Sequence, residues 1–221
     1  MGGGKLIITN HHLAPHAWRP MRGEWCGIPS AYEALRPLLL SIPYVTDVEW
    51  QDNPTEFTHD FRDFRRMYTA TKSLVHAQAT HLGVKVSHEP WIQLPEYTVK
   101  AAKKISGGRP VISRTLRHTT KTFPWRDILK MGHYVFVGVK SEHEAFEREF
   151  GQVEHIVTHN FLEVAAIIAA SSIFVGNQSC QCWLASAMGH PLIQETMAHA
   201  PDSIVPRDNA VWVKGQLSSQ Y

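Results

Sequence analysis

The stretch IFVGNQSCQCWLASAMGHP, residues 173–191, decides the fold. Its first residues are β-branched and aromatic, which predicts a buried strand, and Gly-Asn-Gln-Ser then leads directly into a helix that ends at Gly189. The free backbone N–H groups at the start of such a helix form an anion site. Ser179 would cap this helix, and Gly176 would allow close backbone approach. A Ser-capped helix without any ligand would show the same pattern.

The segments around this stretch alternate between strand and helix in the same way. Ser141 with Glu144, and Asn160 with Glu163, have the spacing of capping boxes. Strands are predicted over 110–113, 134–139, 155–158, 173–176 and 191–195, and helices over 124–132, 141–151, 161–171 and 179–189. This regular alternation predicts an α/β fold whose parallel sheet has helices on both faces.

The N-terminal half is less regular. Strands are predicted over 5–9 and 44–50, and helices over 30–40 and 60–82, with the second helix ending at Gly83. The start of that long helix, DFRDFRR at 60–66, is typical of an ion-paired amphipathic helix, although it would also suit a polyanionic acceptor. ISGGRP at 105–110 has the composition of a linker. We therefore predict two domains, 1–105 and 106–221.

Composition excludes several classes of protein. Of the 221 residues, 43% are hydrophobic and 19% are charged, which is typical of a globular chain rather than a disordered or fibrous one. The formal net charge of +2 implies no broad electrostatic field toward nucleic acid or membrane. We expect no membrane span and no secretory signal. Because three cysteines cannot form a disulfide framework, we predict a soluble cytosolic protein.

Residues 161–193, FLEVAAIIAASSIFVGNQSCQCWLASAMGHPLI, resemble the sugar-nucleotide-binding segment of the heptosyltransferase-type glycosyltransferases. The resemblance implies a compact GT-B-like arrangement of two Rossmann-like domains. It also implies inverting transfer of a sugar from a nucleotide-diphosphate donor, with neither a metal nor a cofactor. Enzymes of this fold usually have longer chains, so we expect a trimmed N-terminal domain and no C-terminal crossover helix.

The resemblance also implies which residues hold the donor. The Asn-Gln-Ser-Cys turn would contact the diphosphate, SRTLRHTTKTFPW would supply hydroxyl and cationic phosphate ligands, and a carboxylate after the strand ending VFVGV would bind the ribose. Gln178 stands where the family has an acidic residue, and Trp183 stands where it often has a histidine. These differences imply a donor other than ADP-heptose. The donor-binding candidates are Ser113, Arg114, Thr115, Arg117, Lys121, Gly138, Glu142, Asn177, Gln178, Ser179 and Cys180.

These roles also follow from chemistry. A diphosphate leaving group gains negative charge, which either a metal ion or a set of cations and helix amides can stabilise. Arg114 and Arg117 are three residues apart after a strand, so they could bind phosphate oxygens in a forked geometry. A solvated basic loop is the alternative. Glu142 could accept hydrogen bonds from a ribose diol, or it could simply favour the helix dipole.

The acceptor side requires one general base. GEWCGIPSAYEALRPLLLSIPYVTDV resembles the family's N-terminal Gly-Asp segment, with Glu in place of Asp, so Glu24 is the first candidate for the catalytic base. His11 and His12, directly after the first strand, are the second. Together with His16 they could suggest a metal site, but the set lacks the cysteine or carboxylate partner typical of zinc, and we predict none.

Three alternatives to this glycosyltransferase remain open. The first is a non-catalytic module that keeps the nucleotide pocket and binds a partner. The second is a sugar-nucleotide epimerase on the same fold. The third is a virus-type glycosyltransferase that acts on modified DNA, for which duplex binding would depend strongly on salt. Neither the acceptor nor the oligomeric state follows from the sequence.

Overall fold

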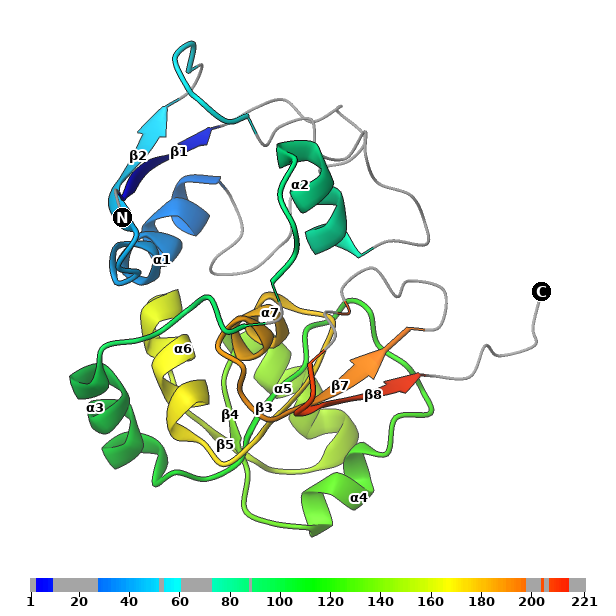
Figure 1. Ribbon diagram of the computed structural model, residues 1–221. Coiled ribbons are helices and arrows are strands. Elements are labelled where there is room, and N and C mark those ends of the chain that lie inside the picture. The colour runs from blue at the N-terminus through cyan, green and yellow to red at the C-terminus, as the bar shows by residue number, and fades with distance from the viewer. Residues whose placement is uncertain are drawn as a thin grey trace.

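The N-terminal part of the chain contains a small parallel sheet (Figure 1). The computed structural model describes residues 3–9, 28–51, 54–60, 73–87, 89–197, 204 and 207–214. Strands β1 (Gly4–Thr9) and β2 (Val45–Gln51) pair in parallel, and α1 (Ile28–Leu40) connects them and continues through Pro37. This βαβ unit agrees with the predicted strands and helix.

The helix expected over 60–82 is shorter than predicted. Helix α2 spans Leu74–Leu82, and Ser73 is its N-cap, with an extended backbone and a side chain that accepts a hydrogen bond from His76 N. Asp60 is not helical either, and residues 61–72 lie outside the described residues. The predicted end at Gly83 is correct, but the extended backbone of Ser73 and its N-cap hydrogen bond make α2 begin at Leu74.

The C-terminal part is a six-stranded parallel sheet in the order β5-β4-β3-β6-β7-β8 (Figure 1). Numbered from β3, this is the order 3-2-1-4-5-6 of a Rossmann-type sheet. The strands are β3 (Val111–Ser113), β4 (Val135–Phe136), β5 (Glu154–His155), β6 (Phe174–Asn177), β7 (Leu192–Thr196) and β8 (Ala210–Lys214). The helices are α3 (Glu96–Ser106), α4 (Trp125–Lys130), α5 (Lys140–Phe150), α6 (Phe161–Ala170) and α7 (Cys180–Ala187).

Each face of this sheet carries its own hydrophobic core. Val111 and Phe174 pack with α6 and α7 on one face, whereas Ile112 and Val175 pack with α4 and α5 on the other. Because side chains alternate along a strand, consecutive residues of β3 and β6 serve opposite cores. These strands are therefore buried on both faces, as their continuous apolar sequence predicts.

Helix α6 is apolar on nearly every side because other helices surround it. Asn160 is its N-cap and accepts a hydrogen bond from Glu163 N at 3.0 Å, as predicted. The helix lies on the sheet and also contacts α1, α3 and α7. A helix with neighbours all round buries every face, which explains the run of Val, Ala and Ile between its charged first turn and its end.

The N-terminal βαβ unit and the segment that connects α2 to α3 both contact the C-terminal part. Residues 105 and 106 end α3, and Gly107 is its C-cap, so the expected linker is partly helical. The domain boundary after residue 105 stays a prediction. In this connecting segment, Trp91 N donates to Ala187 O at 2.9 Å, and Tyr44 Oη donates to Trp91 O at 2.6 Å.

Among the described residues, we find no helix with the length and apolar character needed to cross a membrane.

Candidate functional site

The order of the strands reverses between β3 and β6. Ligands of open α/β sheets bind outside the carboxyl ends of the strands at this point. Ser113 and Gly176 are register partners there, and a Cβ on Gly176 would lie 2.9 Å from Ser113 O and 2.7 Å from the Phe174 ring. Only glycine therefore allows β3 and β6 to approach as they do, and the residues that follow both strands lie side by side.

The Asn-Gln-Ser segment, which ends β6 and leads into α7, has the N-cap that the sequence predicts. Ser179 is the N-cap of α7, and its Oγ accepts a hydrogen bond from Cys182 N at 3.3 Å. The hydroxyl proton can still be donated, because the cap uses only a lone pair. The first amides of α7 lack partners within the helix, and Cys180, its first residue, is exposed. Gln178 is buried, and its Oε1 accepts a hydrogen bond from Met197 N at 2.8 Å.

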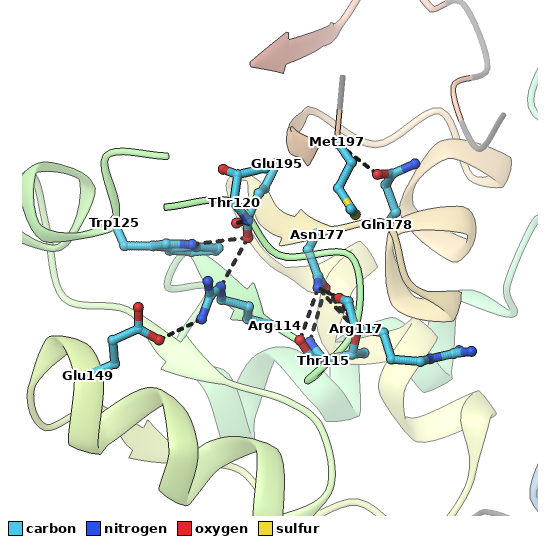
Figure 2. A network of polar contacts seen from close by, with 10 residues as sticks. All are labelled: Arg114, Thr115, Arg117, Thr120, Trp125, Glu149, Asn177, Gln178, Glu195 and Met197. Carbon is cyan, nitrogen blue, oxygen red and sulfur yellow. Dashed lines mark hydrogen bonds and ion pairs between the residues drawn. The ribbon is translucent and has the colours of Figure 1, made fainter. Parts of the chain in front are cut away.

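Asn177 is fully buried and joins β6 to the loop after β3 (Figure 2). Its Oδ1 accepts a hydrogen bond from Thr115 N at 3.0 Å. Its Nδ2 donates to Thr115 O at 3.0 Å and also to Arg117 O. Asn177 thus uses both ends of its amide on backbone groups, and the side chain itself is not presented to a ligand.

Arg114 is held by two carboxylates (Figure 2). Its Nε donates to Glu195 Oε2 at 3.1 Å, its Nη1 donates to Glu149 Oε2 at 2.8 Å, and its guanidinium lies over the Phe150 ring. The side chain is only 10% exposed. Little of the guanidinium surface is therefore presented to a phosphate. Sequence reasoning did not single out Glu195 or Glu149.

Most of the remaining candidates lie in the β3–α4 loop, residues 114–124, and are more accessible than Arg114. Arg117 and Lys121 are exposed, and Thr115 is half-buried. In Figure 2 the Arg117 side chain points away from Arg114 and its two carboxylate partners. The Ser113 hydroxyl is fully buried and has no hydrogen-bond partner among the described residues. Among the predicted donor-binding residues, the loop therefore presents the exposed cations Arg117 and Lys121. It also carries the half-buried Thr115 hydroxyl, which donates to Arg117 O at 3.2 Å.

Glu142 lies at the carboxyl end of the neighbouring strand, β4. Helix α5 begins after Val139, and Glu142 Oε2 accepts a hydrogen bond from Val139 N at 3.3 Å. The expected capping box of Ser141 and Glu144 is therefore wrong, because the helix begins earlier and Glu142 occupies its third position. Burial raises the pKa of Glu142 to about 7, although the Val139 amide and the Arg117 charge oppose the rise.

Gly138 shapes the backbone beside this carboxylate. It has a φ of +153°, and a Cβ there would lie 3.0 Å from Glu142 Oε2 and 2.9 Å from the Phe136 ring. Its carbonyl oxygen lies 2.9 Å from His155 Nε2. Glycine is favoured here because both the torsion and the space disfavour a side chain. Gly138 and Glu142 are thus adjacent beyond the carboxyl end of β4, and their predicted roles in donor binding stay a prediction.

We expect Glu142 to make stability depend on pH. Since its pKa rises from 4.5 to about 7 on folding, the folded state binds more protons between these values, and the free energy of unfolding falls as pH increases across that window. The decline is at most about 3 kcal/mol. Glu142→Gln should remove it in urea unfolding at pH 5, 6, 7 and 8, whereas the exposed control Glu144→Gln should keep it. Equal slopes in the wild type and Glu142→Gln would contradict this assignment.

The three base candidates, Glu24, His11 and His12, lie outside the described residues. The structure therefore leaves their role as a prediction. Across the described ranges, no group of three His, Cys, Asp or Glu side chains is arranged to hold a metal ion.

The strand order defines a Rossmann-like α/β architecture. No protein-family model and no curated protein matches the sequence. Among solved structures, the chain is similar to the Escherichia coli ADP-heptose LPS heptosyltransferase II. The TM-score is 0.50 at 15% identity, over 84% of this chain and 80% of that one.

Two further structures give lower scores. The family 9 glycosyl transferase from Veillonella parvula DSM 2008 has a TM-score of 0.48 at 14% identity, over 82% of this chain and 56% of that one. The E. coli heptosyltransferase WaaC with ADP has 0.44 at 18% identity, over 64% and 48%. At these identities the likeness concerns the fold. The fold is α/β, with parallel sheets flanked by helices, and is consistent with the GT-B-like heptosyltransferase fold, which confirms the predicted class.

Proposed function

We propose that this protein is a glycosyltransferase that binds a nucleotide-diphosphate sugar at the carboxyl edge of β3, β4 and β6. The observation that carries the proposal is the convergence at this edge of the α7 N-terminus, the β3–α4 loop and Glu142, on a fold similar to that of a heptosyltransferase. The diphosphate would lie on the first amides of α7 and the Ser179 hydroxyl. The ribose would lie near Gly138 and Glu142.

The proposed reaction is inverting and needs no metal. A base, with Glu24, His11 and His12 as candidates, removes the proton of an acceptor hydroxyl, and the oxygen attacks the anomeric carbon. The bond from that carbon to the diphosphate breaks, and the nucleoside diphosphate leaves with the bonding electrons. Arg117, Lys121 and the amides of α7 would stabilise its growing charge. Because Gln178 stands where the heptosyltransferase-type family has an acidic residue, and Trp183 where it often has a histidine, we propose a donor other than ADP-heptose.

Binding tests the proposal first. ADP, GDP, UDP and CDP, and their sugar conjugates, should be screened by thermal shift. A ligand at 100 times its dissociation constant should stabilise the fold by about 2.7 kcal/mol. Arg117→Ala with Lys121→Ala should weaken that stabilisation, whereas Lys104→Ala on the outer side of α3 should not. If none of these nucleotides raises the melting temperature, the proposal is wrong.

Turnover then separates the alternatives. Transfer should release the nucleoside diphosphate only in the presence of an acceptor, and the product should have inverted anomeric configuration. Glu24→Gln, His11→Asn and His12→Asn should be assayed individually, and loss of transfer with normal nucleotide binding identifies the base. A donor altered without an acceptor indicates an epimerase, salt-dependent duplex binding indicates a DNA substrate, and binding without turnover indicates a non-catalytic module.

A further inference from the structure

Two buried side chains on neighbouring strands organise the β3–α4 loop, residues 114–124. Asn177 on β6 and Glu195 on β7 are register partners in the parallel ladder, and both are fully buried. Both make hydrogen bonds to this loop or to the residue after it (Figure 2). The loop carries Thr115, Arg117 and Lys121. Its conformation therefore decides where these potential phosphate ligands lie.

Glu195 binds the beginning, the middle and the end of this segment with one carboxylate. Its Oε2 accepts hydrogen bonds from Arg114 Nε at 3.1 Å and Trp125 Nε1 at 3.1 Å, and its Oε1 accepts one from Thr120 N at 2.5 Å. These donors span the loop from its first residue to the first residue of α4. A single buried group therefore fixes the ends of the loop and its midpoint relative to β7.

The charge on Glu195 is better explained by the need to position the β3–α4 loop than by a gain in the stability of the fold. Burying a carboxylate and a guanidinium is expensive, and an apolar replacement of similar volume often stabilises a fold equally well. The ion pair instead fixes the orientation of the Arg114 side chain, because a guanidinium bound to two carboxylates has little freedom to rotate. Arg114 bridges Glu195 on β7 to Glu149 on α5, so the start of the loop is fixed between a strand and a helix.

We infer that Glu195 is a positioning residue for donor binding, which acts through Arg114 and the β3–α4 loop rather than by touching the donor. This inference rests on the proposed function. Glu195 holds the loop in one conformation before the donor arrives, so that Thr115, Arg117 and Lys121 need not be ordered on binding. Arg114 is then part of the support for this loop, and the diphosphate is bound by the other cations and the α7 amides.

Glu195→Gln tests this role, because it keeps the size of the side chain and removes the charge that Arg114 requires. ADP, GDP, UDP and CDP should each be titrated beside their parent nucleosides by isothermal calorimetry, with wild type and variant. We expect the variant to lose at least about tenfold in affinity for the diphosphate that the wild type binds best, equivalent to one charged hydrogen bond. Affinity for the parent nucleoside should change less than about twofold, since it lacks the phosphates.

Glu149→Gln is the matched control. It also removes a carboxylate from Arg114, but Glu149 is exposed and does not bind Thr120 or Trp125, so diphosphate affinity should fall less than about threefold. Arg114→Lys provides a second test, which carries the result if Glu195→Gln does not fold. Lysine keeps the charge but not the forked geometry, and we expect the same selective loss of diphosphate affinity.

The outcomes separate the two proposals. Wild-type protein that binds none of the four diphosphates overturns the proposed function, and this inference with it. Wild-type protein that binds a diphosphate, with Glu195→Gln equal to it, overturns only the positioning role, even if the variant melts at a lower temperature. An equal loss of nucleoside and diphosphate affinity also overturns it, because a general loosening of the fold would affect both.

Discussion

Trp125→Ala should lower the free energy of unfolding by about 3–5 kcal/mol, as expected for removal of a fully buried large aromatic side chain. Trp125 is 1% exposed. Its ring centroid lies 4.7 Å from that of Phe123 and 5.2 Å from that of Phe146. The substitution would leave a cavity between α4, α5 and the sheet, and it would also remove one of the donors to Glu195. Urea unfolding followed by circular dichroism measures the loss.

Two further variants separate packing from hydrogen bonding. Trp125→Phe keeps one aromatic ring but removes the Nε1 donor and the second ring of the indole, so it should destabilise by about 1–3 kcal/mol, less than Trp125→Ala. Tyr97→Ala removes an aromatic side chain that is 76% exposed on α3, and it should change stability by no more than about 0.5 kcal/mol. A loss below about 1 kcal/mol for Trp125→Ala would show that Trp125 is not packed as described.

The elements that sequence reasoning located best are those whose signals are local. Asn160 and Glu163 are three residues apart and cap α6 through their own hydrogen bonds, and Ser179 caps α7 in the same way. Gly176 was singled out for close approach, and it lies against Ser113 O. Each of these features depends on residues close in sequence or on one strand pairing. A local pattern still failed for Ser141 and Glu144, because α5 begins directly after Val139.

The features that were missed depend on which strands become neighbours. Glu195 was placed on a strand, but its partner Arg114 is 81 residues away, and the pair forms only because β7 follows β6 and β3 in the sheet. The charge pattern alone could not distinguish Arg114, whose side chain is only 10% exposed, from Arg117, which is exposed. One signal was available: an acidic residue at the end of a buried strand requires a buried cation or several N–H donors.

Asn177→Asp should lower the free energy of unfolding at pH 7 by about 3 kcal/mol or more, although it exchanges one NH2 group for an oxygen. Nδ2 of Asn177 donates to Thr115 O and Arg117 O, so an aspartate oxygen at that position would face two carbonyl oxygens. Both carbonyls would lose this donor, although Arg117 O would keep the Thr115 hydroxyl at 3.2 Å. An unsatisfied buried group such as Thr115 O costs about 1–3 kcal/mol. The new charge would also lie beside Glu195, the register partner of residue 177.

The dependence on pH identifies the cause. The repulsive surroundings would raise the pKa of the new carboxyl in the folded state, so the destabilisation should shrink as pH falls from 7 toward 5, where a protonated carboxyl can donate again. Asn209→Asp is the matched control, because Asn209 also donates to a backbone carbonyl, that of Gly189, but is exposed. Water can replace that donor, so the control should lose about 1 kcal/mol or less at either pH. Similar losses in both variants would contradict the role of Asn177 as the buried connection between β6 and the β3–α4 loop.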